Sequence, residues 1–214
     1  MATQTSDLAP LQAIASAYSA GQLSLWEATG QALQALIDRI HCSRVSLWGF
    51  DLEGGTRTLR CIAVKNDAED LATDTTLLRE NEYRDYFAAL VRTGVFVAPD
   101  ARTDPMLKAM RGAFLDSHQI GALLDVAITI NGRAYGIVCC EQIPGPRLWS
   151  PDDIAAARAA VSRAALLIAS EPGIDFDAMP SVPIEPFGMT AHEPRGVAPA
   201  RSAPDRRVRG KPDT

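Results

Sequence analysis

The four cysteines are the first residues of this sequence whose chemistry suggests a redox, catalytic or metal-binding role. Cys42, Cys61, Cys139 and Cys140 form no C-x-x-C pair, the spacing that is typical of zinc sites and redox motifs. Cys139 and Cys140 are adjacent in an expected strand, so their side chains point to opposite faces and cannot easily bridge each other. Cys42 and Cys61 are expected to be strand neighbours, but no acid or base near them in the sequence would activate a thiolate. The pattern predicts buried, reduced thiols, no disulfide framework and no metal site.

Two charge pairings are predicted from residues that interrupt or end apolar strands. Asp125 lies in the apolar run L-L-D-V-A-I, and its carboxylate needs a partner because burying an unpaired charge is costly. Arg60 and Arg102 are the candidate partners, and loop amides are another source of donors. We expect Asp125 to be a structural anchor, with contact to a ligand as the alternative. Glu141 and Arg44 lie at strand ends and are expected to pair across the sheet end.

Other catalytic patterns are missing from the sequence. It has no G-x-S-x-G motif, no phosphate-binding loop and no H-x-x-x-H spacing. The adjacent Asp152 and Asp153 are expected at the start of a helix, where negative charge interacts favourably with the helix dipole. His118 is expected to be a polar cap or a surface group at a helix end. Together these features favour a protein that is not an enzyme.

The length and charge of the chain exclude several classes of protein. Its 214 residues, 47% of them hydrophobic, suit one domain of common size with an appendage and not a large multidomain enzyme. The net charge of −5 argues against nucleic acid as the main partner. No stretch is long and apolar enough to span a membrane, and the N-terminus lacks the features of a signal peptide. We therefore expect a cytoplasmic protein without a membrane partner.

The composition changes sharply in the last fifth of the chain. Eight of the 14 prolines lie in residues 172–214, and prolines at this density prevent regular helices and sheets. This segment is predicted to be a disordered tail. Its basic end carries Arg206, Arg207, Arg209 and Lys211, and it is expected to make at most weak contacts with nucleic acid. The predicted organisation is an N-terminal helix in residues 1–23, a folded domain in 24–171 and the tail in 172–214.

Hydrophobic periodicity and turn signals divide the folded part into helices and strands. Ser24 and Glu27 form an S-x-x-E capping-box pattern, and Asp104 before a proline marks the start of another helix. Asn131-Gly132 is a strong signal for a type I′ hairpin turn. Helices are expected in residues 6–21, 24–40, 79–91, 104–118 and 150–170, and strands in 43–51, 57–65, 95–97, 121–130 and 133–142. Because hairpin strands dominate, the sheet should be mainly antiparallel, with helices on its faces, in an α+β fold.

The final expected helix has a regular apolar pattern. Ile154, Val161 and Ile168 recur in it every seven residues, with alanine in much of the space between them. Such a face suits close helix packing, either inside the domain or between two chains. We expect a homodimer that forms through this helix.

Four segments of the chain carry a resemblance to a known family. They are R-x-S-L-W-x-F-D at residues 44–51, V-A-P-D-A-R-T-D-P at 97–105, I-G-A-L-L-D-V-A-I-T-I at 120–130, and G-I-V-C-C-E at 136–141 with R-L-W-S-P-D-D after it. Together, over the span from residue 24 to residue 170, they resemble a GAF domain of the bacterial sensory type, which is found joined to histidine kinases and cyclases.

The resemblance implies a central antiparallel sheet of five to six strands with helices on both faces. It also implies a small-molecule pocket over one face of the sheet, and a sensory or regulatory role in which the signal leaves through the terminal helices. The expected recipient of the signal is a separate partner protein, such as a kinase or a cyclase. The candidate pocket residues are Tyr83, Tyr86, Phe87, Asp100, Met110, Phe114 and Asp125.

The sequence does not identify a ligand. The N-K-x-F-D-E signature of cyclic-nucleotide GAF domains is missing, and Met110 and Arg111 stand where bilin-binding members place a Cys-His pair. No covalently attached bilin and no haem is therefore expected. Two alternatives remain open. One is a ligand-free dimerisation or interaction module, and the other is a thiol enzyme similar to free methionine sulfoxide reductases, whose loop cysteines are missing here.

Overall fold

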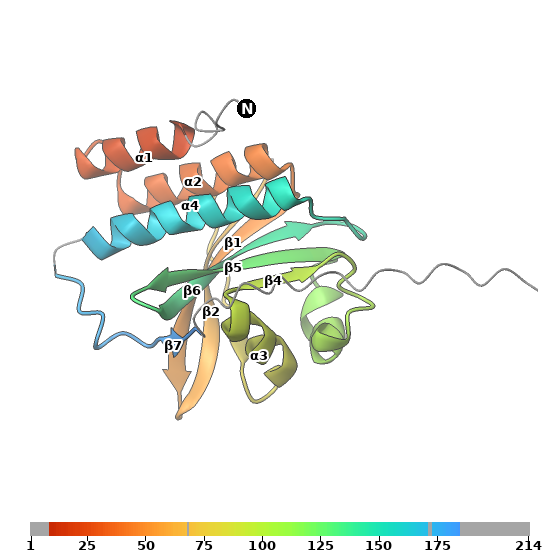
Figure 1. Ribbon diagram of the computed structural model, residues 1–214. Coiled ribbons are helices and arrows are strands. Elements are labelled where there is room, and N and C mark those ends of the chain that lie inside the picture. Colours follow the sequence, from red (N-terminus) through yellow and green to blue (C-terminus); the bar gives the residue numbers. More distant parts are fainter. Residues whose placement is uncertain (1–8, 68, 171–172, 185–214) are drawn as a thin grey trace, which may run out of the picture.

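A seven-stranded antiparallel sheet with helices on both faces makes up the fold (Figure 1). The computed structural model describes residues 9–67, 69–170 and 173–184. Its helices are α1 (Ala9–Ser19), α2 (Leu25–Ile40), α3 (Arg84–Thr93) and α4 (Pro151–Ser170), together with the 3₁₀-helix η2 (Pro105–Met110) and the π-helix η3 (Arg111–Leu115). Its strands are β1 (Arg44–Glu53), β2 (Thr56–Asn66), β3 (Leu77–Arg79), β4 (Val95–Ala98), β5 (Ala122–Ile130), β6 (Arg133–Gln142) and β7 (Val182–Pro183). The predicted α+β fold with an antiparallel sheet is confirmed.

The strands follow the order β3-β2-β1-β6-β5-β4, and β7 pairs with β6. Two hairpins, β1–β2 and β5–β6, supply the four long strands. At the tip of the β5–β6 hairpin, Asn131 and Gly132 have φ values of 50° and 74°. Positive φ at both positions is what a type I′ turn requires, so the predicted turn is the one that sets the register of this hairpin.

Each face of the sheet has its own apolar core. Helices α1, α2 and α4 lie together on one face, which we call the α4 face, and α3, η2 and η3 lie on the other, the α3 face (Figure 1). Neighbouring strand residues alternate between the two, so that Cys140 and Val45 belong to the core of the α4 face and Cys139 and Trp48 to that of the α3 face. The sheet thus separates a helical layer from a layer of shorter, irregular elements.

Helix α2 begins as its capping-box pattern predicts. The Ser24 hydroxyl accepts a hydrogen bond from the Glu27 N–H at 3.2 Å, and the Glu27 carboxylate accepts one from the Ser24 N–H at 2.8 Å. These two bonds satisfy donors at the helix start that would otherwise have no partner. The start and direction of α2 are therefore fixed locally, before any packing on the sheet.

The helix expected over residues 104–118 is a 3₁₀-helix followed by a π-helix. It starts as predicted, because the Asp104 carboxylate accepts a hydrogen bond from the Met106 N–H at 2.8 Å. The spacing of the buried side chains is compatible with these irregular turns. Leu107 and Met110 are three residues apart, one turn of a 3₁₀-helix, and Phe114 follows Met110 by four, a spacing that a wider turn accommodates. All three therefore reach the α3 face.

The first part of the predicted tail is packed against the sheet, which corrects its assignment to disorder. β7 pairs with the start of β6, and Val182 is only 2% exposed. Isolated prolines are compatible with an edge strand, because the missing N–H of Pro183 is needed only where a partner accepts from it. The basic end of the predicted tail, at residues 206–211, lies outside the described residues.

The seven-residue pattern of α4 marks an internal face. Val161 is 3% exposed within one chain, and Ile154 and Ile168 pack against the core of the α4 face. Their spacing therefore reflects packing on the sheet and on α2, while Ile154 and Ile168 remain partly exposed, and a homodimer through this helix stays a prediction. On the outer side of α4, Leu166 is 69% exposed. No helix among the described residues has the length and apolar character needed to cross a membrane.

Candidate functional site

Three polar side chains lie in register across the sheet on the α3 face. Ser46 on β1 is paired with Cys139 on β6, which in turn is paired with Asp125 on β5. All three are buried. A polar row of this kind in the floor of an otherwise apolar layer is unusual, because buried polar groups cost free energy unless they are bonded. We call Ser46, Cys139 and Asp125 the polar floor.

Asp125 is the one carboxyl group of the polar floor. The Tyr86 hydroxyl on α3 donates to its Oδ2 at 2.9 Å, whereas its Oδ1 is buried and accepts no hydrogen bond of standard geometry. Burial raises the pKa of Asp125 to about 7, although the Cys139 thiol and the Tyr86 hydroxyl favour the charged form. The same burial, together with the charge of Asp125, raises the pKa of Tyr86 well above its usual value. At neutral pH the Asp125 carboxyl thus exchanges between donor and acceptor forms.

The arginine partners predicted for Asp125 are wrong. Arg60 is exposed on β2 and pairs with Asp51, with 3.3 Å between Nε and Oδ2. Arg60 lies between Leu59 and Cys61, which both face the core, so strand alternation turns its side chain away from Asp125.

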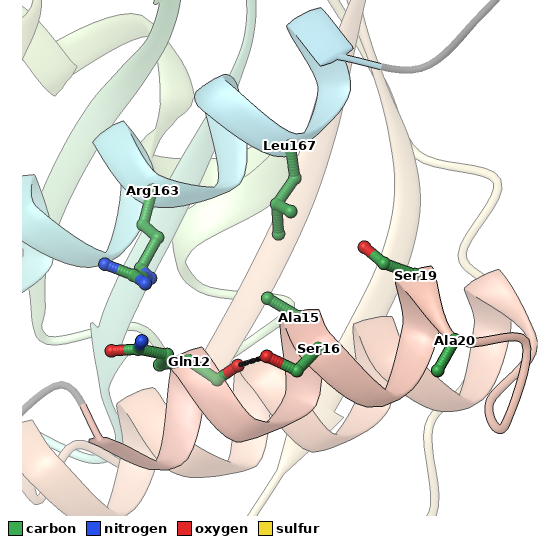
Figure 2. A pocket seen from close by; sticks show the side chains of 7 residues that line it. All are labelled: Gln12, Ala15, Ser16, Ser19, Ala20, Arg163 and Leu167. Carbon is green, nitrogen blue, oxygen red and sulfur yellow. Dashed lines mark hydrogen bonds between the residues drawn. The ribbon is translucent and has the colours of Figure 1, made fainter.

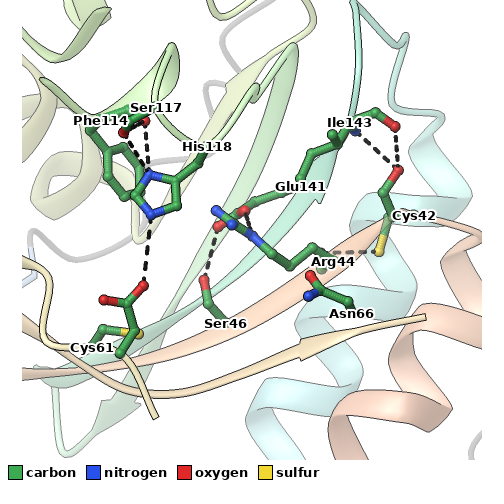
Figure 3. Close-up of polar contacts among 12 residues, drawn as sticks. Cys42, Arg44, Ser46, Cys61, Asn66, Phe114, Ser117, His118, Glu141 and Ile143 are labelled. Atoms are coloured by element: carbon green, nitrogen blue, oxygen red, sulfur yellow. Dashed lines mark hydrogen bonds and ion pairs between the residues drawn. The ribbon is translucent and has the colours of Figure 1, made fainter. Parts of the chain in front are cut away.

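A second set of buried polar residues on the α3 face contains an ion pair between Arg44 and Glu141 (Figure 3). The pairing predicted for these two residues is therefore confirmed. Arg44 Nε donates to Glu141 Oε2, and the Ser46 hydroxyl donates to Glu141 Oε1 at 2.9 Å. Trp48 Nε1 in turn donates to the Ser46 oxygen at 2.8 Å. This chain of bonds compensates a carboxylate that is completely buried, as a buried charge requires.

Aromatic side chains from the short helices cover the polar floor. Tyr86 and Phe87 come from α3, and Phe114 comes from η3. Tyr86 makes edge contacts with Phe87 and Phe96, at centroid distances of 5.8 and 5.2 Å, and Phe114 makes one with Trp48 at 5.8 Å. Phe87 is only 1% exposed, so the aromatic layer closes over the floor in this state.

Six of the seven predicted pocket residues meet on the α3 face. They are Tyr83, Tyr86, Phe87, Met110, Phe114 and Asp125. Asp100 lies apart, in the loop after β4, where its carboxylate accepts from the Arg102 N–H at 3.1 Å. That bond caps the loop after β4. Ser46 and Cys139 were not predicted as site residues. They lie beside Asp125 because of the registers of β1 and β5 on β6, and register cannot be read from a single strand.

The four cysteines are free and divide between the two faces. Cys61 and Cys139 lie in the core of the α3 face, and Cys42 and Cys140 in that of the α4 face. The prediction that Cys139 and Cys140 point to opposite faces is confirmed, and the expected proximity of Cys42 and Cys61 is wrong. Burial raises the pKa of Cys61 to about 12 and also raises that of Cys139, so both thiols are protonated. Within the described residues, His, Cys, Asp and Glu side chains form no cluster suited to a metal ion.

His118 fastens the end of η3 to the connection between β2 and β3 (Figure 3). Its Nδ1 lies 2.9 Å from the Phe114 carbonyl oxygen, and its Nε2 lies 3.7 Å from Asp74 Oδ2. The ring also packs on Phe114 at 4.9 Å. This agrees with the expected polar role at a helix end.

Two hollows lie away from the α3 face. One, of about 530 Å³, lies between α1 and α4, and its lining is shown in Figure 2: Gln12, Ala15, Ser16, Ser19, Ala20, Arg163 and Leu167. The other, of about 260 Å³, lies at the loops around Asp100 and Leu148. Neither contains a residue of the polar floor.

Comparison with known proteins identifies the domain. The family model of the GAF domain matches residues 27–168, and a search of curated proteins gives no match. Among solved structures, the phycocyanobilin-bound GAF domain from a cyanobacterial phytochrome is similar, with a TM-score of 0.61 and 16% identity over 78% of this chain and 96% of that one.

Two further structures share the fold. The first is the structure of a far-red absorbing dark state with bound biliverdin IXa. It has a TM-score of 0.56 and 15% identity, over 74% of this chain and 97% of that one. The second is the chromophore-binding domain of Stigmatella aurantiaca bacteriophytochrome, with a TM-score of 0.56 and 15% identity. The match covers 78% of this chain but only 61% of that one. Because the family model covers well over half of its residues, this chain belongs to the GAF domain family.

Proposed function

We propose that this GAF domain is a non-catalytic sensory module that binds a small molecule over the polar floor. One observation carries the proposal: Asp125 is only 1% exposed, yet its Oδ1 accepts no hydrogen bond of standard geometry and is left with the weak donor Cys139 nearby. A buried acceptor without a partner is costly, and a donor group of a ligand would satisfy it. The signal would leave through the terminal helices to a separate effector protein, such as a kinase or a cyclase.

The chemistry of the face defines the class of ligand. A planar molecule carrying an N–H or O–H group would bond to Asp125 and stack among aromatic side chains. It would enter by displacing Met110 and Phe114. These lie on η2 and η3, whose hydrogen bonding is weaker than that of an α-helix. The described arrangement is thus the closed state of the site, and ligand binding would select an open one.

A bilin does not fit this arrangement, although the similar structures named above carry bilins. Phe87, Met110 and Phe114 occupy the space above the floor. Cys61 and Cys139 are protonated and buried, so neither offers a thiolate for covalent attachment. We therefore expect a smaller ligand that is held without a covalent bond.

Native mass spectrometry of the protein purified from its host tests the proposal. We expect a reproducible additional mass, lost on denaturation, that is reduced at least ten-fold in occupancy in Asp125→Asn. Asp51→Asn is the matched control, because the exposed Asp51 contacts Arg60 and the N–H of its neighbour Leu52, away from the polar floor, and should keep the additional mass. If the native mass equals that of the chain alone, the ligand-binding proposal is wrong.

The tight packing of Phe87 and Met110 favours a second candidate, a ligand-free dimerisation or interaction module. It predicts a dimer without any bound molecule, and the same spectra distinguish the two candidates. The third candidate, a thiol-dependent reductase, needs a reactive thiolate, and the raised pKa values of Cys61 and Cys139 oppose one. Turnover of methionine sulfoxide with a thiol reductant would revive it.

A further inference from the structure

Strands β1 and β6 separate near the tip of the β5–β6 hairpin, which leaves a short edge on β6. The β1–β6 pairing ends at Gly49 and Gly136, while β6 continues down to Arg133. A Cβ on Gly136 would lie 2.2 Å from the Trp48 carbonyl oxygen, so the two backbones touch here just before they separate. Beyond this point the edge of β6 faces no other long strand.

Residues 173–184, which we call the strap, occupy that edge (Figure 1). Val182 pairs with Ala134, and the Ile184 N–H donates to the Gly132 carbonyl oxygen at 3.0 Å. Arg133 Nε donates to the Ser181 hydroxyl at 2.8 Å. The strap is therefore an added edge strand at the hairpin tip.

Side chains anchor the strap on both faces of the sheet. Phe176 packs on Tyr135 with a centroid distance of 5.2 Å, and the Tyr135 hydroxyl donates to the Phe176 carbonyl oxygen at 3.4 Å. Further along, Val182 enters the core of the α3 face, and Ile184 packs against the same core. The docked sequence thus has an aromatic anchor, a valine six residues later and an isoleucine two residues after that.

The strap is weakly held compared with the strands it joins. Val182 is its one buried residue among residues 173–184, and Met179 is 40% exposed. Pro183 follows Val182 and removes a donor, so the ladder with β6 is limited to two residues. Docking orders a dozen residues, and the entropy that they lose offsets most of the free energy gained from these few contacts. The docked strap therefore has little net stability.

We infer that the edge of β6 at Gly132–Ala134, with Tyr135, is a strand-docking slot and that the strap is its displaceable intramolecular ligand. The slot recognises an extended peptide through backbone hydrogen bonds, and alternate side chains supply specificity, as in other strand-addition sites. Its occupant is the chain's own segment, because that segment carries the matching anchors Phe176, Val182 and Ile184. Arg133 adds a donor for a hydroxyl side chain.

Hydrogen exchange of single amides tests whether the strap opens by itself. We expect the Ile184 amide to exchange at least 100-fold faster than that of Ile137, which lies between two paired strands, after correction for intrinsic rates. If the two amides exchange at the same rate, the strap opens only with global unfolding and is not displaceable.

A synthetic peptide of residues 173–184 with a fluorescent label tests the slot. We expect it to bind the full-length variant Val182→Asp at least ten-fold more tightly than the wild type, because the wild-type slot is occupied by its own strap at high effective concentration. A control peptide with aspartate in place of the valine should not bind. If the variant lacks a cooperative thermal transition, Ile184→Asp replaces it, since Ile184 is only half-buried. If the peptide does not bind the folded variant, or if it binds the variant and the wild type equally well, the inference is wrong.

Discussion

The protonation of Asp125 couples the stability of the fold to pH. Its pKa is about 7 in the folded chain and 3.8 in the ordinary, solvated state, so the folded chain holds this proton more tightly. Proton binding to Asp125 therefore adds to the free energy of unfolding. This contribution, roughly 4 kcal/mol, is fully present below about pH 4 and is lost as the pH rises through about 7. The groups that face this carboxyl are Tyr86, Cys139 and, further away, Glu141.

We predict that Asp125→Asn is more stable than the wild type at pH 8 and loses most of the pH dependence between pH 4 and 7. Asparagine keeps an acceptor for the Tyr86 hydroxyl and carries no charge to bury. Urea denaturation at several pH values measures the effect. Asp51→Asn, an exposed control, should follow the wild-type curve, and parallel curves for Asp125→Asn and wild type would contradict the prediction.

The sequence predicted some of these residue contacts and not others, for a physical reason. Arg44 and Glu141 were paired correctly because both stand at strand ends, and β1 and β6, far apart in the chain, are neighbours in the sheet. The polar floor depends on register, since a shift of one residue on β6 would place Cys140 instead of Cys139 next to Asp125. Periodicity within one strand contains no information about that alignment.

At the scale of elements, the contact between β1 and β6 depends on a glycine. A Cβ at Gly136 would lie 2.2 Å from the backbone oxygen of Trp48, and neither backbone can move without breaking the ladder. We predict that Gly136→Ala destabilises the fold by about 1–3 kcal/mol or more, the usual cost of overpacking. Gly112→Ala is the control, because nothing lies within 4 Å of its Cβ position. Thermal unfolding measures both, and equal stability of the two variants would contradict the argument.

Local signals predicted the elements that begin or turn at their own residues. The cap at Ser24 and the hairpin at Asn131-Gly132 are examples, because each depends on contacts within four residues. The short β3 and the strap were missed, since both are held by partners far along the chain. Likewise, the spacing of Val161 predicted a packed face, but only the fold shows that the sheet fills it.

At the scale of the whole molecule, we predict that the expected homodimer uses the outer side of α4. Leu166 is 69% exposed there, and burying such a side chain contributes about 1.5–3 kcal/mol. We predict a dimer by light scattering, with twice the 23.0 kDa of one chain. Leu166→Glu should raise its dissociation constant at least ten-fold.

Leu148→Glu provides the control for this surface. Leu148 is 86% exposed, and it precedes α4 in a loop near the other hollow, so its substitution should leave the dimer intact. A wild-type mass of 23.0 kDa at all concentrations would show that no such dimer forms.

The strap also determines how the domain responds to mechanical force. A pull applied at Ile184 acts first on its bond to Gly132 and on the anchors at Val182 and Phe176, and not on α4. Once detached, the strap could span at most about 40 Å, at 3.3–3.6 Å for each of a dozen residues, and the gain in length is this span minus the distance it already covers when docked. Until that slack is used, α4 stays packed on the sheet. Under such a pull the strap would give way before the helical layer.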